Sequence, residues 1–476
     1  MKEKAGNHWL ILILLAFAQF MVVLDISIVN VMLPAVQRAF HMTPTNLQWI
    51  ITAYTLAFGG FLLLGGRAAD LFGRRRIFLT GVIVFALASL ADGLSQSGGM
   101  LIGLRLVQGL AGAFMSPAAL SIVLVTYREG HERNLALSVW GAVASGGAAV
   151  GVLLGGIITQ YFGWRWCFFI NVPIGALVLL GAWRLVPAHE SEERRNDLDL
   201  LGAIAVTAGL VALVYGLVKA PLDGWTAHST LIAFGASVLL LIAFILNEWQ
   251  VERPLMPLSI FKLRNVSGAN LMQLANAAAL FSTFFFSSLY VQDILGYSPV
   301  RTGLSFLVMP VVIAIAATNV PRVIKRVGYK PVLMVGPLFT AAGLFMLAHV
   351  PVQGHYDSDL LPGFVVMAFG LGSTFVSVMI AATSGVAGHL SGLASGLVNT
   401  AQQIGGSLGL AVLSGIAASS TTRFLQHASG THTPATAAAA TVHGFQNGFY
   451  IAMCFALLAF LLAVFVIKRQ KPSTES

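Results

Sequence analysis

Two ionisable side chains lie within long apolar stretches of the 476-residue sequence, where a charge is costly and therefore informative. Asp25 precedes Pro34 by nine residues in the first such stretch, and Arg105 lies near the start of the fourth. At about 1.5 Å per residue, helices would place them about 14 Å and about 9 Å deep, in the same outer half of a membrane. Because an ionised carboxylate costs at least about 2.5 kcal/mol within a span, such a residue usually marks a functional site.

Together, the Asp25 carboxyl group and the Arg105 guanidinium could bind and release a proton. Burial favours the uncharged form of the Asp25 carboxyl group, whereas a nearby guanidinium favours the carboxylate. Movement of Arg105 relative to Asp25 would therefore change how tightly the carboxyl group holds a proton. The simpler interpretations are that interfacial water hydrates Asp25 and that Arg105 only ties neighbouring backbone carbonyl groups together. Asp25 is expected to be the one clearly buried acid of the chain.

The composition indicates what kind of protein positions these residues. Apolar residues make up 57% of the chain and charged residues 9%, whereas a soluble globular chain carries about 25% charged residues. This balance excludes an ordinary cytosolic enzyme, a disordered protein and a disulfide-rich secreted domain. Cys167 and Cys454 are too few for a disulfide framework. The basic residues behind the net charge of +9 punctuate apolar runs, so we expect a membrane protein without a nucleic-acid partner.

Long apolar stretches recur along the whole chain. Each stretch of about 20 apolar residues can cross a bilayer as a helix, and the sequence contains about fourteen of them. They lie near residues 9–33, 47–66, 76–95, 100–124, 135–160, 166–187, 200–219, 229–247, 265–292, 302–321, 331–350, 360–383, 391–418 and 444–467. The predicted fold class is therefore all-α, a polytopic membrane protein. A segment rich in Ala, Thr and Ser near 421–443 is expected to be a flexible extracellular loop.

The distribution of positive charge predicts the orientation. With the N-terminus inside, the cytoplasmic segments hold 21 of the 27 Lys and Arg residues, and the opposite loops hold 5. Such an asymmetry is the positive-inside pattern of membrane proteins. Both termini are therefore expected in the cytoplasm.

Two linkers and a faint repeat predict the domain organisation. The charged stretch Glu190–Asp199 and the stretch from Glu248 to Arg264 divide the spans into blocks of six, two and six. The predicted domains are residues 1–189, 190–258 and 259–476. The segments 66–76 and 321–331 each follow the second span of a six-span block and align at Gly73 and Gly328. The two blocks therefore look like degenerate copies, as the halves of transporters often are.

Several sequence motifs lie in particular spans or in the segments next to them. The first span carries Leu24, Asp25, Val29, Asn30, Val31, Leu33 and Pro34; the next cytoplasmic segment carries Gly66, Asp70, Gly73, Arg74, Arg75 and Arg76; and the fourth span carries Arg105, Gln108, Gly109, Gly112 and Ala113. The stretch Trp164–Gly175 and the run 392–409 complete the set. Together they resemble the fourteen-helix drug:proton antiporter branch of the major facilitator superfamily. The resemblance implies two six-helix bundles plus two inserted helices in the bacterial plasma membrane.

The resemblance also implies roles for residues outside the Asp25 and Arg105 pair. Gly66, Asp70, Gly73 and Arg74 would form a conformational latch, with Glu132 and Arg133 as weaker partner candidates. The antiporter motif of the fifth span is met by Gly147, Gly151, Gly155 and Gly156. Its usual prolines are replaced by Ala148 and Val152, which removes a local bend and weakens the antiport assignment slightly.

The substrate is expected to contact polar and aromatic residues that face a central cavity. The candidates are Gln19, Phe20, Asn30, Trp49, Tyr54, Gln273, Asn276, Phe281, Phe285, Tyr290, Asn399 and Gln402. The sequence contains no HExxH motif and no phosphate-binding Gly-Lys-Ser/Thr loop, so neither a metal, a cofactor nor an enzymatic activity is expected. The partners predicted are small lipophilic substrates, protons and membrane lipids, with the chain acting as a monomer.

The leading hypothesis is proton-coupled efflux of lipophilic drugs or antibiotics by alternating access. One alternative is a dedicated exporter of one endogenous metabolite or lipid. Another is a membrane sensor or scaffold that kept the fold without transport, against which the presence of Asp25, Arg105 and Asp70 counts.

Overall fold

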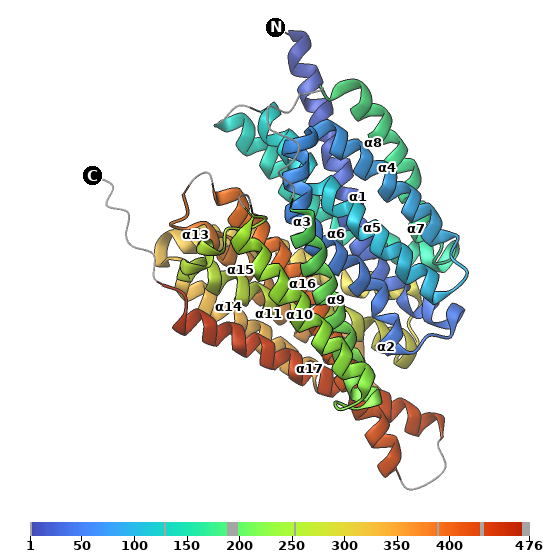
Figure 1. Cartoon of the computed structure of the whole chain (residues 1–476). Coiled ribbons are helices and arrows are strands. Elements are labelled where there is room, and N and C mark those ends of the chain that lie inside the picture. The colour runs from blue at the N-terminus through green and yellow to red at the C-terminus, as the bar shows by residue number, and fades with distance from the viewer. Residues whose placement is uncertain are drawn as a thin grey trace. The chain divides into compact units, whose positions relative to one another are not determined.

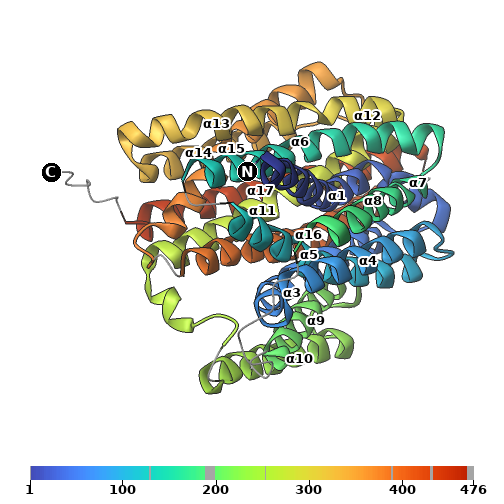
Figure 2. The same cartoon turned by 90° about the horizontal axis from the view of Figure 1, so that it is seen from above.

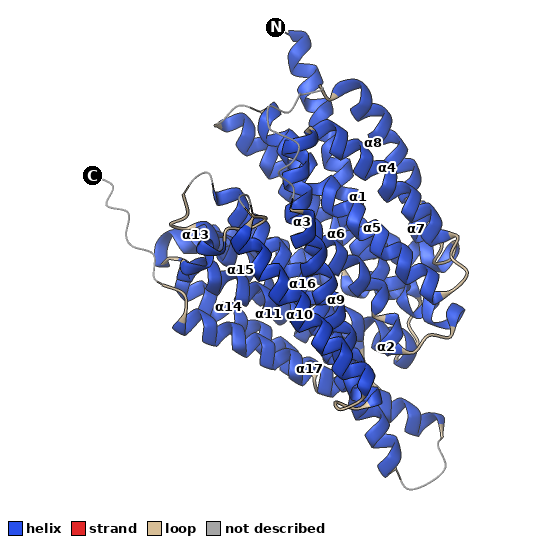
Figure 3. Ribbon diagram, viewed as in Figure 1, coloured by secondary structure: helices blue, strands red, loops and turns tan. Residues whose placement is uncertain are grey.

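The computed structural model describes residues 2–127, 130–187, 199–251, 254–387, 390–428 and 433–468. Within these ranges the regular structure is helical and contains no strand (Figure 3). Fourteen helical segments of the described part are long and apolar enough to cross a membrane, which confirms the number of spans predicted from the sequence. The fold class is therefore all-α, with many spans.

The chain forms two compact units. The first comprises Met1–Val211, Ser237–Leu255 and Ser298–Leu304, and the second comprises Ala212–Ala236, Met256–Tyr297 and Ser305–Ser476. Each unit contains part of the inserted helices α9 and α10, whereas the sequence predicted these as a separate segment of residues 190–258. The predicted three-part division remains a prediction, and the linker at Glu190–Asp199 lies almost wholly outside the described residues.

The helices follow one another along the chain in the order that the colours of Figure 1 show. The first eight, all in the first unit, are α1 (Lys2–Phe40), α2 (Pro44–Leu47), α3 (Trp49–Phe72), α4 (Arg74–Gly93), α5 (Gly98–Thr126), α6 (His131–Tyr161), α7 (Trp166–Phe169) and α8 (Asn171–Leu185). The remaining elements are α9 (Leu200–Asp223), α10 (His228–Gln250), η1 (Leu258–Lys262), α11 (Arg264–Leu289), η2 (Tyr290–Ile294), α12 (Pro299–Phe306), α13 (Val308–Val327), α14 (Tyr329–Leu347), η3 (Tyr356–Leu360), α15 (Leu361–Thr383), α16 (Ser391–His427) and α17 (Pro434–Phe465).

Small residues bring the helices of the first unit close together. A Cβ atom added at Gly65 of α3 would overlap the backbone of Ala113 in α5, and one added at Gly109 of α5 would overlap the backbone of Tyr54 in α3. Such small residues are common where helices pack within membranes, because the backbones can then approach closely. Figure 2 shows the packed neighbours of this unit, α4 beside α5 and α1 beside α8.

The second unit packs by the same means. Gly405 and Gly409 of α16 lie against Leu274 and Ala278 of α11. Helices α14, α15 and α17 pack on α11, α13 and one another. Each unit therefore has its own tightly packed helical core.

The Gly-centred repeat predicted from the sequence has the same structure in both units. Gly73 ends α3 and precedes α4 with φ of 93°, and Gly328 ends α13 and precedes α14 with φ of 78°. Residues with a side chain rarely adopt a positive φ. Glycine adopts it readily and so allows one helix to end and the next to begin within a single residue. The segment 66–76, which follows the predicted span 47–66, is helical except at Gly73.

The prediction of a flexible loop at 421–443 is wrong for the described residues of that segment. Helix α16 continues to His427, and α17 begins at Pro434. The Thr433 side chain accepts a hydrogen bond from the backbone N–H of Thr436 at 3.2 Å, which caps α17. Proline at the first helical position and the alanines that follow favour a helix, whereas the sequence analysis gave more weight to the small polar residues.

Candidate functional site

Asp25 and Arg105 form an ion pair in the interior of the first unit. Asp25 lies in the middle of α1, and Arg105 lies two turns into α5, which begins after the N-cap Ser97. The Nη1 atom of Arg105 donates to Oδ2 of Asp25 at 2.5 Å, and the side chains are 1% and 0% exposed. The structure therefore brings together the two side chains that the sequence analysis paired.

Neutral amides complete the surroundings of the Asp25 carboxyl group. Its Oδ1 atom accepts hydrogen bonds from the Gln108 amide at 3.0 Å and from the Asn171 amide at 3.1 Å. Arg105 also donates to Oε1 of Gln108 at 2.5 Å and, through Nε, to the carbonyl oxygen of Ile50 at 3.1 Å. Charge-assisted hydrogen bonds of this kind stabilise a buried carboxylate and fix its orientation. Arg105 thus has backbone and side-chain partners at once.

Aromatic rings cover the guanidinium of Arg105. Its Cζ atom lies 4.3 Å from the centre of the Tyr54 ring and 5.8 Å from that of Phe168. A cation over an aromatic face is stabilised by the ring quadrupole, and more strongly when water is excluded. Tyr54, a candidate for the substrate cavity, is fully buried and also stacks on Phe58. The structure thus places Tyr54 in the shell around Arg105.

The expectation of a single buried acid is wrong. Asp92, in the last turn of α4, is 0% exposed, and neither of its carboxyl oxygens has a hydrogen-bond partner among the described residues. Asp92 lies one helical turn after Ser89, which the Asn171 amide links to Asp25. Asp92 was not predicted as a site residue because it lies near the end of an apolar stretch, where a carboxylate is usually hydrated. A sequence signal was nevertheless present, since Asp92 falls within the predicted span 76–95.

Asn171 and Ser89 link the regions around the two acids. The Asn171 amide donates both to Asp25 and, at 3.0 Å, to Oγ of Ser89, which in turn donates to the carbonyl oxygen of Phe168 at 2.9 Å. Ser89 lies one turn before Asp92 on α4. In the sequence, Asn171 stands out only as part of the stretch Trp164–Gly175 and Gln108 only as part of a motif, and neither pattern predicts a role for the residue.

The residues of the predicted latch lie where α3 meets α4. Asp70 is in the last turn of α3, and its Oδ1 accepts hydrogen bonds from Nε and Nη2 of Arg74 at 3.2 and 3.1 Å. Gly66 lies one turn before Asp70, and a Cβ atom there would meet only ordinary contact with Pro117. Arg75 donates to the carbonyl oxygen of Trp183 in α8. This junction is therefore tied to α8.

The weaker latch candidates lie at the start of α6. Glu132 is exposed, and Arg133 donates through Nε to the carbonyl oxygen of Tyr127 at 3.3 Å. Asp70 forms its ion pair with Arg74, four residues along the chain. A latch formed with Glu132 or Arg133 remains a prediction.

The glycines of the antiporter motif line the contact of α6 with α1. Cβ atoms added at Gly147, Gly151 and Gly155 would meet Val23, Ser27 and Ile28 respectively. Gly156 faces the backbone of Pro299 in the same unit. Helix α6 runs from His131 to Tyr161 as one α-helix, in keeping with the absence of proline at Ala148 and Val152.

The remaining substrate candidates of the first unit are partly buried. Gln19 accepts a hydrogen bond from the Ser116 hydroxyl at 2.9 Å, and the Asn30 amide donates to the Ile26 carbonyl at 3.0 Å. Phe20 and Trp49 keep part of their surface exposed. A role in substrate binding remains a prediction for all of them.

The candidates of the second unit differ in burial. Gln273, Asn276 and Phe285 are buried on α11, and the Tyr290 hydroxyl donates to the Pro351 carbonyl at 2.6 Å. Asn399, Gln402 and Phe281 are half-buried. Their place on a substrate path also remains a prediction.

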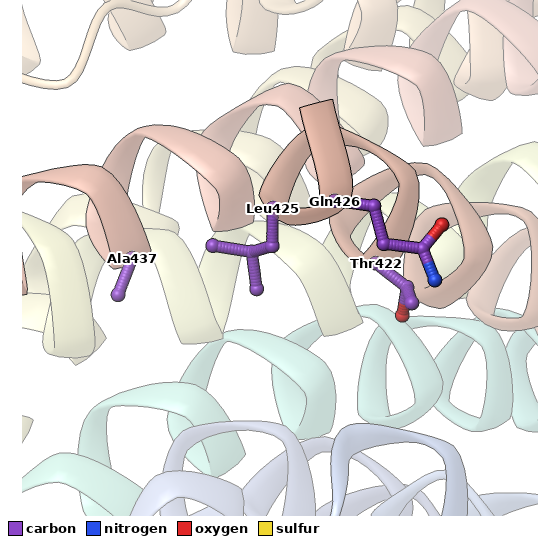
Figure 4. A pocket seen from close by; sticks show the side chains of 4 residues that line it. All are labelled: Thr422, Leu425, Gln426 and Ala437. Atoms are coloured by element: carbon purple, nitrogen blue, oxygen red, sulfur yellow. The ribbon is translucent and has the colours of Figure 1, made fainter. Parts of the chain in front are cut away.

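A shallow pocket of the second unit contains none of these candidates. It is lined by Thr422, Leu425 and Gln426 of α16 and by Ala437 of α17 (Figure 4). Its few lining side chains carry no charge, so it adds nothing to the site around Asp25.

Comparison with known proteins gives the family and the fold. The family model described as Major Facilitator Superfamily matches residues 15–410. The chain is 40% identical over 459 residues to the puromycin resistance protein pur8 of Streptomyces alboniger, covering 96% of this chain and 90% of that protein. It is 35% identical over 414 residues to the tetracenomycin C resistance and export protein of Streptomyces glaucescens, covering 87% of this chain and 77% of that protein.

The chain is also similar to a mycobacterial resistance protein and to the solved structure of another transporter. The chain is 32% identical over 411 residues to the multidrug resistance protein Stp of Mycobacterium tuberculosis, covering 86% of this chain and 76% of that protein. A bacterial homolog of the human lysosomal transporter Spinster, solved in an inward-facing conformation, has a TM-score of 0.70 at 15% identity, covering 98% of this chain and 99% of that one. At this identity the structural likeness supports the fold alone.

Proposed function

Since the chain belongs to the Major Facilitator Superfamily, we propose that it exports antibiotics or other lipophilic compounds across the bacterial cytoplasmic membrane in exchange for protons. The names of its relatives support export, because they describe resistance to puromycin and resistance to and export of tetracenomycin C. The fourteen apolar helices are those expected of a protein that crosses the membrane many times.

Proton coupling is supported by one observation above the others, the ion pair of Asp25 with Arg105 in a fully buried setting. A proton that binds the Asp25 carboxylate removes its charge and frees the guanidinium from its closest partner. Because a charge without a partner is costly in the interior, the surrounding helices then favour a different arrangement. Protonation can thereby bias a conformational equilibrium.

The proposed cycle couples this bias to transport. Protonation of Asp25 from outside favours release of the substrate, and loss of the proton to the cytoplasm resets the transporter. One charge that crosses the membrane supplies about 2.3 kcal/mol per 100 mV, so one or two protons provide useful work. Alternating access of the site to the two sides links the steps.

Puromycin uptake into everted membrane vesicles tests the proposal. Vesicles with the unaltered protein should accumulate puromycin when a proton gradient is imposed, and vesicles with Asp25→Asn should not. The matched control is Asp223→Asn, because Asp223 forms an exposed ion pair with Lys219 at 3.4 Å and should not affect coupling. Unchanged gradient-driven uptake by Asp25→Asn would contradict the proposal.

A second candidate function is the dedicated export of one compound. It is favoured by relatives whose names each specify a single antibiotic, such as tetracenomycin C and lincomycin, whereas the multidrug resistance protein Stp favours broad export. Competition of puromycin uptake by charged and uncharged lipophilic compounds separates the two. A dedicated exporter would be inhibited by close analogues of one compound only.

The orientation and the partners belong to the same proposal. The positive charge of the predicted cytoplasmic segments supports termini on the cytoplasmic side, in a monomer surrounded by lipid. Cysteines introduced at the exposed Arg76 and Asn46, with Cys167 and Cys454 replaced, test the orientation. A membrane-impermeant maleimide should label Asn46→Cys from outside the cell and should leave Arg76→Cys unlabelled.

A further inference from the structure

We propose that Asp92 is a second proton-carrying carboxyl group, which shares one proton with Asp25 in the field of the Arg105 guanidinium. This inference rests on the proton coupling proposed above and extends it to a residue that neither the sequence motifs nor the predicted site contained. It is carried by the burial of Asp92, by the lack of hydrogen-bond partners for its carboxyl oxygens and by its place beside the Asp25 network.

The surroundings of Asp92 favour an uncharged carboxyl group. Its side chain is fully buried, and neither oxygen accepts a hydrogen bond within the described part of the chain. Asp25, by contrast, receives Arg105, Gln108 and Asn171 as donors. Because an ionised carboxylate without partners is very costly in an apolar interior, Asp92 holds a proton while Asp25 is ionised.

The charges around Asp92 are few. The described charged groups that act on Asp92 are Arg105 of α5 and Asp25 of α1, and Arg165 and the Cys167 thiol lie at the start of α7. Arg165 is exposed and donates to the backbone carbonyl of Ser95 at 3.2 Å, and the Cys167 thiol contacts the Thr159 hydroxyl at 3.3 Å. The positive charge available to both buried acids is therefore that of Arg105.

One guanidinium with two carboxyl groups gives a neutral cluster only when one proton is present. Transfer of that proton breaks the O–H bond of Asp92 and forms one on Asp25. Arg105 keeps its charge throughout, losing the attraction of the Asp25 carboxylate and gaining that of Asp92, so the net charge does not change. Ionisation of both acids would leave one buried negative charge without compensation, which is strongly unfavourable.

Polar side chains lead from Asp25 to within one helical turn of Asp92. The Asn171 amide contacts both Asp25 and Ser89, and Ser89 lies one helical turn before Asp92. On the other side of Asp92 the buried Ser95 hydroxyl has no hydrogen-bond partner among the described residues, and the Ser95 carbonyl is held by Arg165. Water bridging these polar groups would carry the proton. In the predicted orientation, this row of groups runs from the outer end of α4 towards Asp25.

The test uses the purified full-length protein in proteoliposomes, with puromycin as the substrate and two modes of transport. Asp92→Asn should keep puromycin exchange in the absence of a pH gradient and should lose gradient-driven accumulation by about a hundredfold, as expected when a proton-transfer group is removed. Asp92→Glu, which keeps the carboxyl group, should restore part of the gradient-driven accumulation. Asp223→Asn should behave as the unaltered protein. Gradient-driven accumulation by Asp92→Asn at the rate of the unaltered protein would overturn the proposal.

Infrared spectroscopy gives a readout that needs no transport. The unaltered protein should show the carbonyl stretch of a buried carboxylic acid, and this band should be absent in Asp92→Asn, retained in Asp223→Asn and shifted in Asp92→Glu. If the unaltered protein does not accumulate puromycin, the proposed function fails, and the band alone decides the protonation of Asp92. An acid band that is unchanged in both Asp92→Asn and Asp92→Glu would overturn the proposal whatever the transport result.

Discussion

The side-chain amide of Asn171 donates a 3.1 Å hydrogen bond to Oδ1 of Asp25, which lies 146 residues earlier in the chain. Asn171 is the first residue of α8, and it is fully buried. The hydrogen bond orients the Asp25 carboxyl group, so Asn171 acts as a positioning residue for it.

Replacement of Asn171 by alanine should weaken proton coupling. The substitution removes a hydrogen bond that orients the Asp25 carboxyl group, and a hydrogen bond to a charged group contributes about 1.5–3 kcal/mol. Gradient-driven puromycin uptake should therefore fall by about tenfold or more, whereas puromycin exchange without a gradient should be retained. An equal loss of both activities would indicate a merely structural role.

The ion pair of Asp25 with Arg105 should show strong thermodynamic coupling. Arg105→Met leaves a buried carboxylate without its partner and should destabilise the protein by about 3–5 kcal/mol. Asp25→Asn together with Arg105→Met should be less destabilised than Arg105→Met alone, because the uncompensated charge is gone. Thermal unfolding of the purified variants in detergent measures the difference. Additive effects of the two substitutions would show that the pair is not coupled.

Two glycines of α5 provide a matched test of the close approach that holds Tyr54 over Arg105. A Cβ atom at Gly109 would overlap the carbonyl oxygen of Tyr54 and lie 2.9 Å from its Cα, whereas one at Gly103 would meet nothing within 4 Å. Gly109→Ala should therefore destabilise the protein by about 1–3 kcal/mol, and Gly103→Ala should be neutral or stabilising. Equal thermal stability of the two variants would contradict the described packing of α3 on α5.

The exposed pair of Asp70 and Arg74 should matter for transport more than for stability. The side chains of Arg74 and Asp70 are 33% and 53% exposed, and such a pair contributes at most about 1 kcal/mol. Asp70→Asn should leave the unfolding temperature nearly unchanged and should lower the transport rate if the pair acts as a conformational latch. Asp223→Asn, which breaks a pair of similar exposure, serves as the control. Equal transport by the two variants would exclude the latch.

The number of spans and the position of the ion pair could be predicted from the sequence because both depend on distance along the chain. Apolar stretches of sufficient length must cross the bilayer as helices, and the fourteen helical segments follow them. Asp25 and Arg105 stand at depths that residue counting can estimate. Gly73 and Gly328 were recognised in the same way, from their spacing relative to the ends of spans.

The roles predicted for the substrate candidates and the latch cannot be derived from distance along the chain. They depend on how the helices move and on how a ligand binds. Tyr54 illustrates the difference. It is aromatic and lies in a span, which suits a substrate cavity, yet its ring faces the Arg105 guanidinium at 4.3 Å. A pattern within one helix cannot decide which neighbouring helix a side chain faces.

The sequence by itself determined that the protein spans a membrane many times and that Asp25 and Arg105 are charges within its apolar stretches. Only the tertiary structure decided that Asp92 is buried with them and that Asn171 and Ser89 join the same network. The physical reason is that the burial of a polar group near a helix end depends on which distant helices cover it. Here α7 and α8, which follow Asp92 by more than 70 residues, pack against α4.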